Sequence, residues 1–137
     1  MLDAVNAAPE ALMWLGLTAL LTAVLWVPYV LSLISQMGVG PALMDGEHNT
    51  PLQAPWAGRA RRAHANAVEN LAVFAALLLA VVLSGKASDT VALLAQLFFY
   101  ARLGHALVYI AGLPLIRTLL FFAGFIIQVW LAVLLIG

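Results

Sequence analysis

The sequence predicts an all-α integral membrane protein, built as a bundle of four transmembrane helices. Of its 137 residues, 65% are hydrophobic and 9% are charged, whereas soluble domains contain roughly 45–50% apolar and about 25% charged residues. Four apolar runs reach the length of about 20 residues that a helix needs to cross a bilayer. One longer loop and two short turns connect these runs, and none of them is apolar enough to fold alone, so we expect residues 1–137 to form a single domain.

The four predicted spans are continuous helical segments that are mostly apolar. They cover residues 11–36, 60–84, 90–112 and 118–136. The first run is much longer than the hydrophobic core of a signal peptide and no Lys or Arg precedes it, so we expect it to be retained as a span. Pro28 lies inside this run and is expected to kink its helix.

The connections predict how the spans are oriented. Residues 37–58 form the one long loop, whereas residues 85–89 and 112–114 are tight turns that make successive helices antiparallel. Lys86 is the only basic residue on its side of the bundle. The basic residues on the opposite side are Arg59, Arg61, Arg62 and Arg117. Because positive charge favours the cytoplasmic face, we expect the long loop inside and both termini outside, in a bacterial inner membrane.

Composition excludes several classes of function. The six basic and six acidic residues balance, so no basic field supports a nucleic-acid partner. The chain has no cysteine and therefore no disulfide, thiolate metal ligand or protein thiol nucleophile. No second ligand at metal spacing accompanies His105 and no HExxH motif is present, so no metal site is predicted.

Polar residues inside the second and third spans form two helical stripes. Ionisable groups within a membrane are costly and usually face a bundle interior or a wet cavity. The second span carries its polar residues at intervals of three and four, which places them along one face. They are Arg62, Asn66, Glu69 and Asn70. The third span has the same spacing at Arg102, His105 and Tyr109.

The two stripes also match in depth, because residues equally far from a hairpin turn lie at equal height. Three pairs follow from this rule: Glu69 with Arg102, Asn66 with His105, and Arg62 with Tyr109. We expect Glu69 and Arg102 to form an ion pair, either across the hairpin or across a subunit boundary, because an unpaired charge at that depth is costly.

A simpler interpretation stands beside the functional one. In it, Glu69 and Arg102 have no role beyond neutralising each other's charge, and the other polar groups only form hydrogen bonds between helices. His105 alone is more typical of a packing histidine, Arg62 of an interfacial cation, and Arg117 of a positive-inside anchor. On this interpretation the chain is a structural bundle.

These motifs resemble the MAPEG family, the membrane-associated proteins in eicosanoid and glutathione metabolism, and most closely its microsomal glutathione transferases. One match is the second-span pattern of an arginine, an asparagine four residues on, and a glutamate three beyond, at Arg62, Asn66 and Glu69. The other match joins the third and fourth spans. It consists of Arg102, His105 and Tyr109, followed by Arg117 and residues 121–124.

The resemblance implies a homotrimer that binds glutathione between subunits, open to the cytoplasmic side, and reacts it with hydrophobic electrophiles dissolved in the membrane. The glutathione-binding residues would be Arg62, Asn66, Glu69, His105 and Tyr109. Arg117 would stabilise the thiolate. A peptide thiol has a pKa of about 8.5, and an adjacent cation lowers it and so raises the reactive fraction. Arginine supplies that cation without titrating.

The chain departs from the family pattern in its first span, where many of the enzymes carry an arginine at the cytoplasmic end. Here no Lys or Arg precedes Arg59. The family also contains proteins that bind a membrane lipid or a partner without catalysis. The expected function is therefore a glutathione transferase or glutathione-dependent peroxidase, with a non-catalytic binding protein as the alternative.

Overall fold

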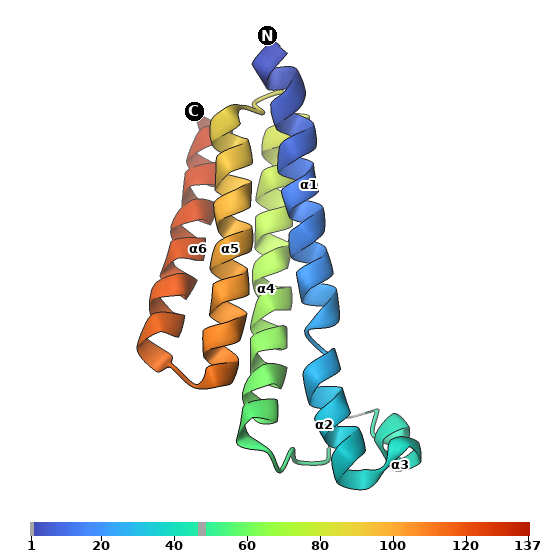
Figure 1. Ribbon diagram of the computed structural model, residues 1–137. Coiled ribbons are helices and arrows are strands. Elements are labelled where there is room, and N and C mark those ends of the chain that lie inside the picture. The colour runs from blue at the N-terminus through green and yellow to red at the C-terminus, as the bar shows by residue number, and fades with distance from the viewer. Residues whose placement is uncertain (1, 47–48) are drawn as a thin grey trace.

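The structure, a computed structural model, describes residues 2–46 and 49–137 and contains only helices as regular elements in that part of the chain (Figure 1). The helices are α1 (Leu2–Val24), α2 (Val27–Met37), α3 (Val39–Met44), α4 (Pro55–Leu83), α5 (Asp89–Ala111) and α6 (Pro114–Ile136). Four helical segments are long and apolar enough to cross a membrane. They are Ala7–Met37, Pro55–Leu83, Asp89–Ala111 and Pro114–Ile136. The predicted fold class is therefore confirmed.

Three helices begin well before the predicted apolar runs, namely α1, at Leu2 rather than residue 11, and two helices that begin at a proline. Pro55 and Pro114 each lie in the first turn of their helix, where proline is tolerated because its missing N–H has no helical partner. These two helices therefore start at the prolines, at residues 55 and 114 rather than 60 and 118. This extension places Arg59 and Arg117 on helices and not in loops.

Pro28 breaks the first span as predicted. α1 ends at Val24 and α2 begins at Val27, because the proline cannot donate to a carbonyl one turn earlier. Just beyond the break, the Tyr29 hydroxyl lies 3.0 Å from Nδ1 of His64. This contact fastens α2 to α4 on the far side of the kink.

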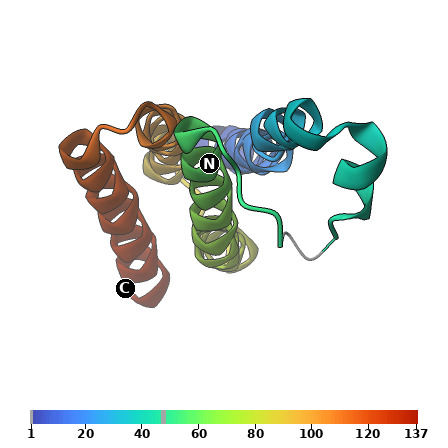
Figure 2. The same ribbon diagram turned by 90° about the horizontal axis from the view of Figure 1, so that it is seen from below.

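α5 is the central helix of the bundle and packs against α1, α4 and α6. Seen from below, α6 stands on one side of α4 and α5, while α2 and α3 lie on the other (Figure 2). The core is densest where Phe74 of α4 stacks on Phe98 of α5, with ring centroids 3.8 Å apart and both side chains fully buried. This contact fits a hairpin whose turn is centred near Gly85 and Lys86, because the two residues are almost equally far from it along the chain.

Arg59 fixes the turn between α5 and α6. Its Nε donates to the Ile110 carbonyl at 2.8 Å, which satisfies one of the free carbonyls at the end of α5. The turn itself uses Gly112 with φ of +82°, a conformation that glycine adopts readily. A side chain at that position would also lie 3.3 Å from the Arg59 guanidinium. Arg59 therefore caps the end of α5 and lies against the turn that leads to α6.

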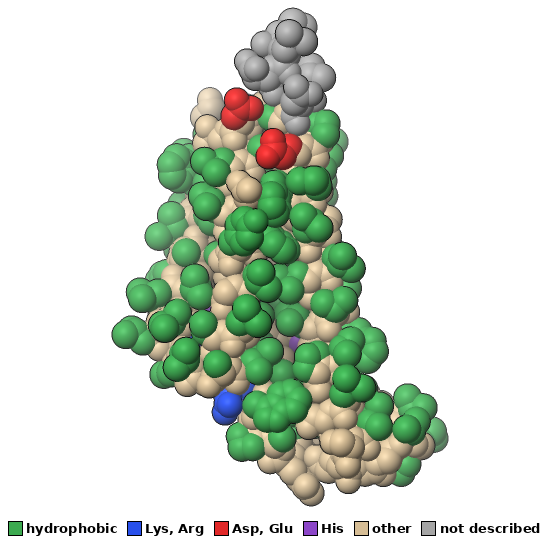
Figure 3. Space-filling model, viewed as in Figure 1, with side chains coloured by type: hydrophobic (Ala, Val, Ile, Leu, Met, Phe, Trp, Pro, Cys, Tyr) green, Lys and Arg blue, Asp and Glu red, His purple; other side chains and the backbone are tan. Residues whose placement is uncertain are grey.

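Hydrophobic side chains cover the sides of the bundle on the face drawn in Figure 3, with acidic groups near one end and basic groups near the other. Both termini lie at the same end of the bundle, and α3 lies at the opposite end (Figure 1). The end that holds both termini is therefore separated from the end that holds the long loop by the full length of the spans, as the predicted orientation requires.

The orientation can be tested with single cysteines, since the chain has none of its own. We expect Ala87→Cys to be labelled by a membrane-impermeant maleimide added to intact cells, because its turn faces outward in the predicted orientation. Gly46→Cys should be labelled only after the membrane is opened. The reverse pattern would show that the bundle is inserted with the opposite orientation.

Candidate functional site

A polar pocket of about 240 Å³ opens between α4, α5 and α6. It is lined by Asn66, His105, Tyr109, Arg117, Thr118 and Phe121. Four of these residues were predicted as site residues from their spacing and from the family resemblance. The structure brings these four together from three helices.

Arg117 and Tyr109 form the cationic part of the pocket. The Arg117 guanidinium carbon lies 4.7 Å from the centroid of the Tyr109 ring, within the range of a cation–π contact. His105 meets the same ring edge-on at a centroid distance of 5.5 Å. Because Arg117 lies in the first turns of α6, the positive end of that helix dipole adds to its charge. The pocket therefore favours an anionic group.

Arg102 lies directly behind this pocket. Its Nη2 donates to Oδ1 of Asn66 at 2.6 Å and lies 3.4 Å from Nδ1 of His105. The side chain is 3% exposed, and its Nε and Nη1 have no protein partner in the described part of the chain. Arg102 is therefore a buried cation in contact with two of the residues that line the pocket.

The polar contacts continue from Asn66 towards the middle of the membrane. Asn70 Nδ2 donates to the Asn66 carbonyl at 2.9 Å, and Gln128 Nε2 of α6 donates to the Asn70 carbonyl at 3.3 Å. These bonds join α4 to α6 next to the pocket.

Within the chain, the predicted pair of Glu69 and Arg102 does not form. Glu69 is exposed on α4, whereas Arg102 donates to Asn66, one turn away along the helix. Equal distance from a turn fixes height but not rotation about the helix axis, and the two side chains point in different directions. The pair across a subunit boundary stays a prediction, and it requires Arg102 to leave its buried position.

Arg62 and Glu69 lie outside the pocket. Both side chains are exposed on α4, and neither lines the cavity. Thr118 and Phe121 do line it, although neither was predicted as part of a site. Phe121 lies four residues after Arg117 and three after Thr118, and this helical spacing is the signal that could have found them.

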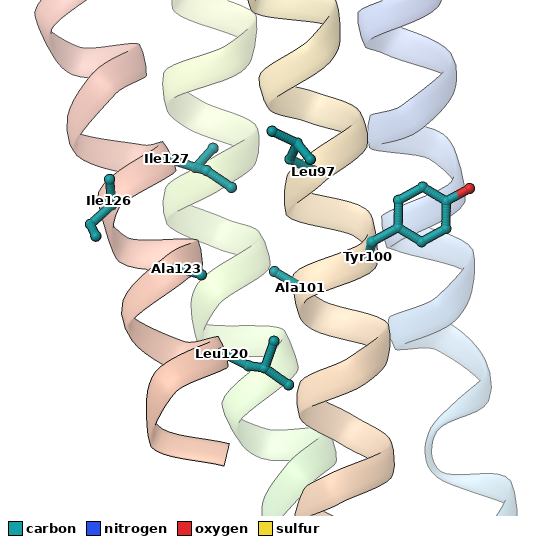
Figure 4. Close-up of a pocket in the computed structure, with 7 residues that line it drawn as sticks. All are labelled: Leu97, Tyr100, Ala101, Leu120, Ala123, Ile126 and Ile127. Atoms are coloured by element: carbon teal, nitrogen blue, oxygen red, sulfur yellow. The ribbon is translucent and has the colours of Figure 1, made fainter. Parts of the chain in front are cut away.

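A second cavity lies between α5 and α6 and has a volume of about 490 Å³. Figure 4 shows its seven lining residues, which are Leu97, Tyr100, Ala101, Leu120, Ala123, Ile126 and Ile127. The Tyr100 ring extends from α5 towards α1, away from α6. This lining offers apolar contact and little else, so the groups capable of chemistry are those of the polar pocket.

The fold and pocket define a class of protein, a four-helix integral membrane protein with a cationic pocket between its second, third and fourth spans. A family model described as the MAPEG family matches residues 11–137. The chain therefore belongs to the MAPEG family, whose members are membrane proteins of glutathione and eicosanoid metabolism. Searches of curated proteins and of solved structures gave no significant match.

Proposed function

We propose that this chain is a membrane-bound glutathione transferase or glutathione-dependent peroxidase that acts on hydrophobic electrophiles and so serves detoxification. The observation that carries the proposal is the convergence of Arg117, Tyr109 and His105 on one pocket inside a bundle of the MAPEG family. A permanent cation in a partly dry site favours the thiolate of a bound thiol over the neutral form. The surrounding apolar helices give a lipid-soluble electrophile access from the bilayer.

In the transferase reaction, the thiol proton leaves to solvent and the thiolate sulfur attacks an electrophilic carbon. A carbon–sulfur bond forms, and the leaving group departs with its electron pair. Arg117 keeps its charge throughout and stabilises the sulfur anion before attack. In the peroxidase reaction, the thiolate attacks the terminal oxygen of a hydroperoxide and the O–O bond breaks. The products are a sulfenic acid and an alkoxide, which takes a proton from solvent to become an alcohol. A second glutathione then yields the disulfide and water.

The roles of the polar residues follow from their chemistry. Asn66, His105 and Tyr109 would hold the part of glutathione that enters the pocket, through hydrogen bonds. Arg62 and Glu69, exposed on α4, would hold a carboxylate and the amino group of the part that extends beyond it. Their exposure suits a ligand that lies partly between two subunits.

We therefore expect a homotrimer. An exposed Glu69 within a membrane span is costly against lipid, and a neighbouring subunit would remove it from the bilayer. Native mass spectrometry in mild detergents should show trimers as the largest abundant species. Monomers alone across several detergents would contradict the expectation and would leave Glu69 facing lipid.

The alternative function is a non-catalytic protein that binds a lipid or a partner. The absence of any Lys or Arg before Arg59 favours it, because one expected contact with a glutathione carboxylate then has no residue to make it. A binder of this type would show neither turnover nor thiolate absorption when glutathione is bound.

One experiment separates these functions. Detergent-purified protein is titrated with glutathione by calorimetry, and conjugation is then measured with a panel of hydrophobic aryl halides and a lipid hydroperoxide. Binding together with turnover supports the enzyme. Binding without turnover and without the thiolate absorption band supports the non-catalytic protein. The absence of binding removes glutathione as the ligand.

A further inference from the structure

Arg102 contacts the inner side of the polar pocket and can only donate hydrogen bonds, because a guanidinium has no acceptor. Its partners Asn66 and His105 each have one end that donates and one that accepts. Both lie within contact distance of the same nitrogen, Nη2. The arginine therefore decides which end of each partner turns towards it.

For Asn66 the outcome is set by a short bond. The Arg102 Nη2 lies 2.6 Å from Oδ1 of Asn66. If the amide were flipped, two donors would face each other at that distance, so the oxygen must point inward. Asn70 Nδ2 also approaches the same oxygen, at 3.4 Å. The amide NH₂ of Asn66 is thereby left to donate into the pocket.

For His105 the same contact selects a tautomer. Nδ1 lies 3.4 Å from Nη2 of Arg102 and must offer its lone pair to it. The proton of the neutral ring is then carried by Nε2, as the hydrogen bond at one ring nitrogen sets the state of the other. The ring lines the pocket, so His105 also becomes a donor towards a ligand.

We propose that Arg102 is a positioning residue that fixes both Asn66 and His105 as hydrogen-bond donors, so that the pocket selects an anionic sulfur over a neutral one. The selection rests on the proposed function, in which a thiolate occupies this pocket. Arg117 and the Tyr109 hydroxyl add donors of their own. Thr118 differs, because its hydroxyl already donates to the Pro114 carbonyl at 2.9 Å. Arg102 itself is too deeply buried to touch the ligand and acts through its two partners.

The orientation of the two partners can be tested without any ligand. In ¹⁵N-histidine spectra, the signals of His105 are those that disappear in His105→Gln. We expect wild-type His105 to be protonated at Nε2 alone, and Arg102→Met to populate both tautomers because the inward donor is gone. Arg102→Lys retains a donor-only cation and should keep the wild-type tautomer. A wild-type ring protonated at Nδ1, or one that already populates both tautomers, overturns the proposal.

The selectivity is tested with two ligands that differ at sulfur, glutathione and S-methylglutathione, whose thioether cannot ionise. Calorimetry should show that Arg102→Met lowers the ratio of their affinities about tenfold, the order of one hydrogen bond to a charged group. Gln96→Met, a polar-to-Met change on α5 outside the pocket lining, should leave the ratio unchanged.

An equal loss for both ligands in Arg102→Met would mean that Arg102 only stabilises the fold, and the proposal would fail. If wild-type protein binds neither ligand, the proposed function fails, while the tautomer of His105 still decides the role of Arg102.

Discussion

Arg117→Ala is expected to lower kcat for conjugation of a hydrophobic aryl halide by about 100-fold, the order seen when one preorganised electrostatic contact is removed. Glutathione affinity should change by only a few-fold, since Arg117 acts on the sulfur and other residues hold the peptide. The reason lies in the pocket, where this guanidinium sits 4.7 Å from the Tyr109 ring centroid and supplies the permanent positive charge of the lining. The value of kcat falls because a smaller fraction of the bound glutathione is then in the reactive thiolate form, while the contacts that hold the peptide are kept.

Two measurements and one control make this result specific. The absorbance near 240 nm of bound thiolate should fall together with kcat, and glutathione affinity is measured on the same preparation. Arg62→Ala removes a cation from the same end of the bundle but outside the pocket. It should weaken binding and leave kcat nearly unchanged, because a contact that holds the peptide is present before and during reaction. Equal kcat in Arg117→Ala and wild type would remove Arg117 from the chemistry.

The fold could be predicted because the bilayer leaves few choices. A run of about 20 apolar residues must satisfy its backbone internally, and a helix does so. The starts of α4 and α6 were harder to place, because Gly58 and Arg59 in α4 and Arg117 in α6 interrupt the apolar pattern close to the first turn. Pro55 and Pro114 mark those starts in the structure, and proline at the first helical position is the signal that locates them.

The sequence predicted which residues form the pocket better than it predicted which of their side chains touch. Spacing of three and four residues identified the faces of the second and third spans, and Asn66, His105, Tyr109 and Arg117 do share one pocket. Counting from the hairpin turn predicted the depth of the residues on the second and third spans. It could not give rotation about each helix axis, which depends on how side chains pack around residues such as Phe74 and Phe98.

That missing rotation explains why Arg102 does not pair with Glu69 within the chain. Depth matched this arginine with Glu69, and charge made an ion pair the expected result. Packing instead turns Arg102 towards Asn66 and leaves Glu69 on the outer surface of α4. A buried guanidinium bonded to neutral acceptors keeps its full positive charge, which adds to the field that favours an anion in the adjacent pocket.

The largest expected effect on binding comes from Asn66→Asp, which should weaken glutathione binding by at least about 100-fold, since a hydrogen bond to a charged group is lost and a like charge is added. One oxygen of the new carboxylate can accept from Arg102, as Oδ1 of Asn66 does now at 2.6 Å. The other oxygen takes the place of the amide NH₂. The ligand then faces a negatively charged acceptor instead of a hydrogen-bond donor.

Asn66→Ala is the matched control for this change, because it removes the donor without adding charge. It should weaken glutathione binding only about tenfold. The Asp variant should also unfold in detergent at a temperature no lower than the Ala variant, since Arg102 gains an ionic partner that truncation cannot provide. Calorimetry gives the two affinities and thermal melts give the two stabilities.

If both variants bind glutathione equally well, the ligand makes no anionic contact beside Asn66. The thiolate would then have to lie elsewhere than in the pocket formed by His105, Tyr109 and Arg117.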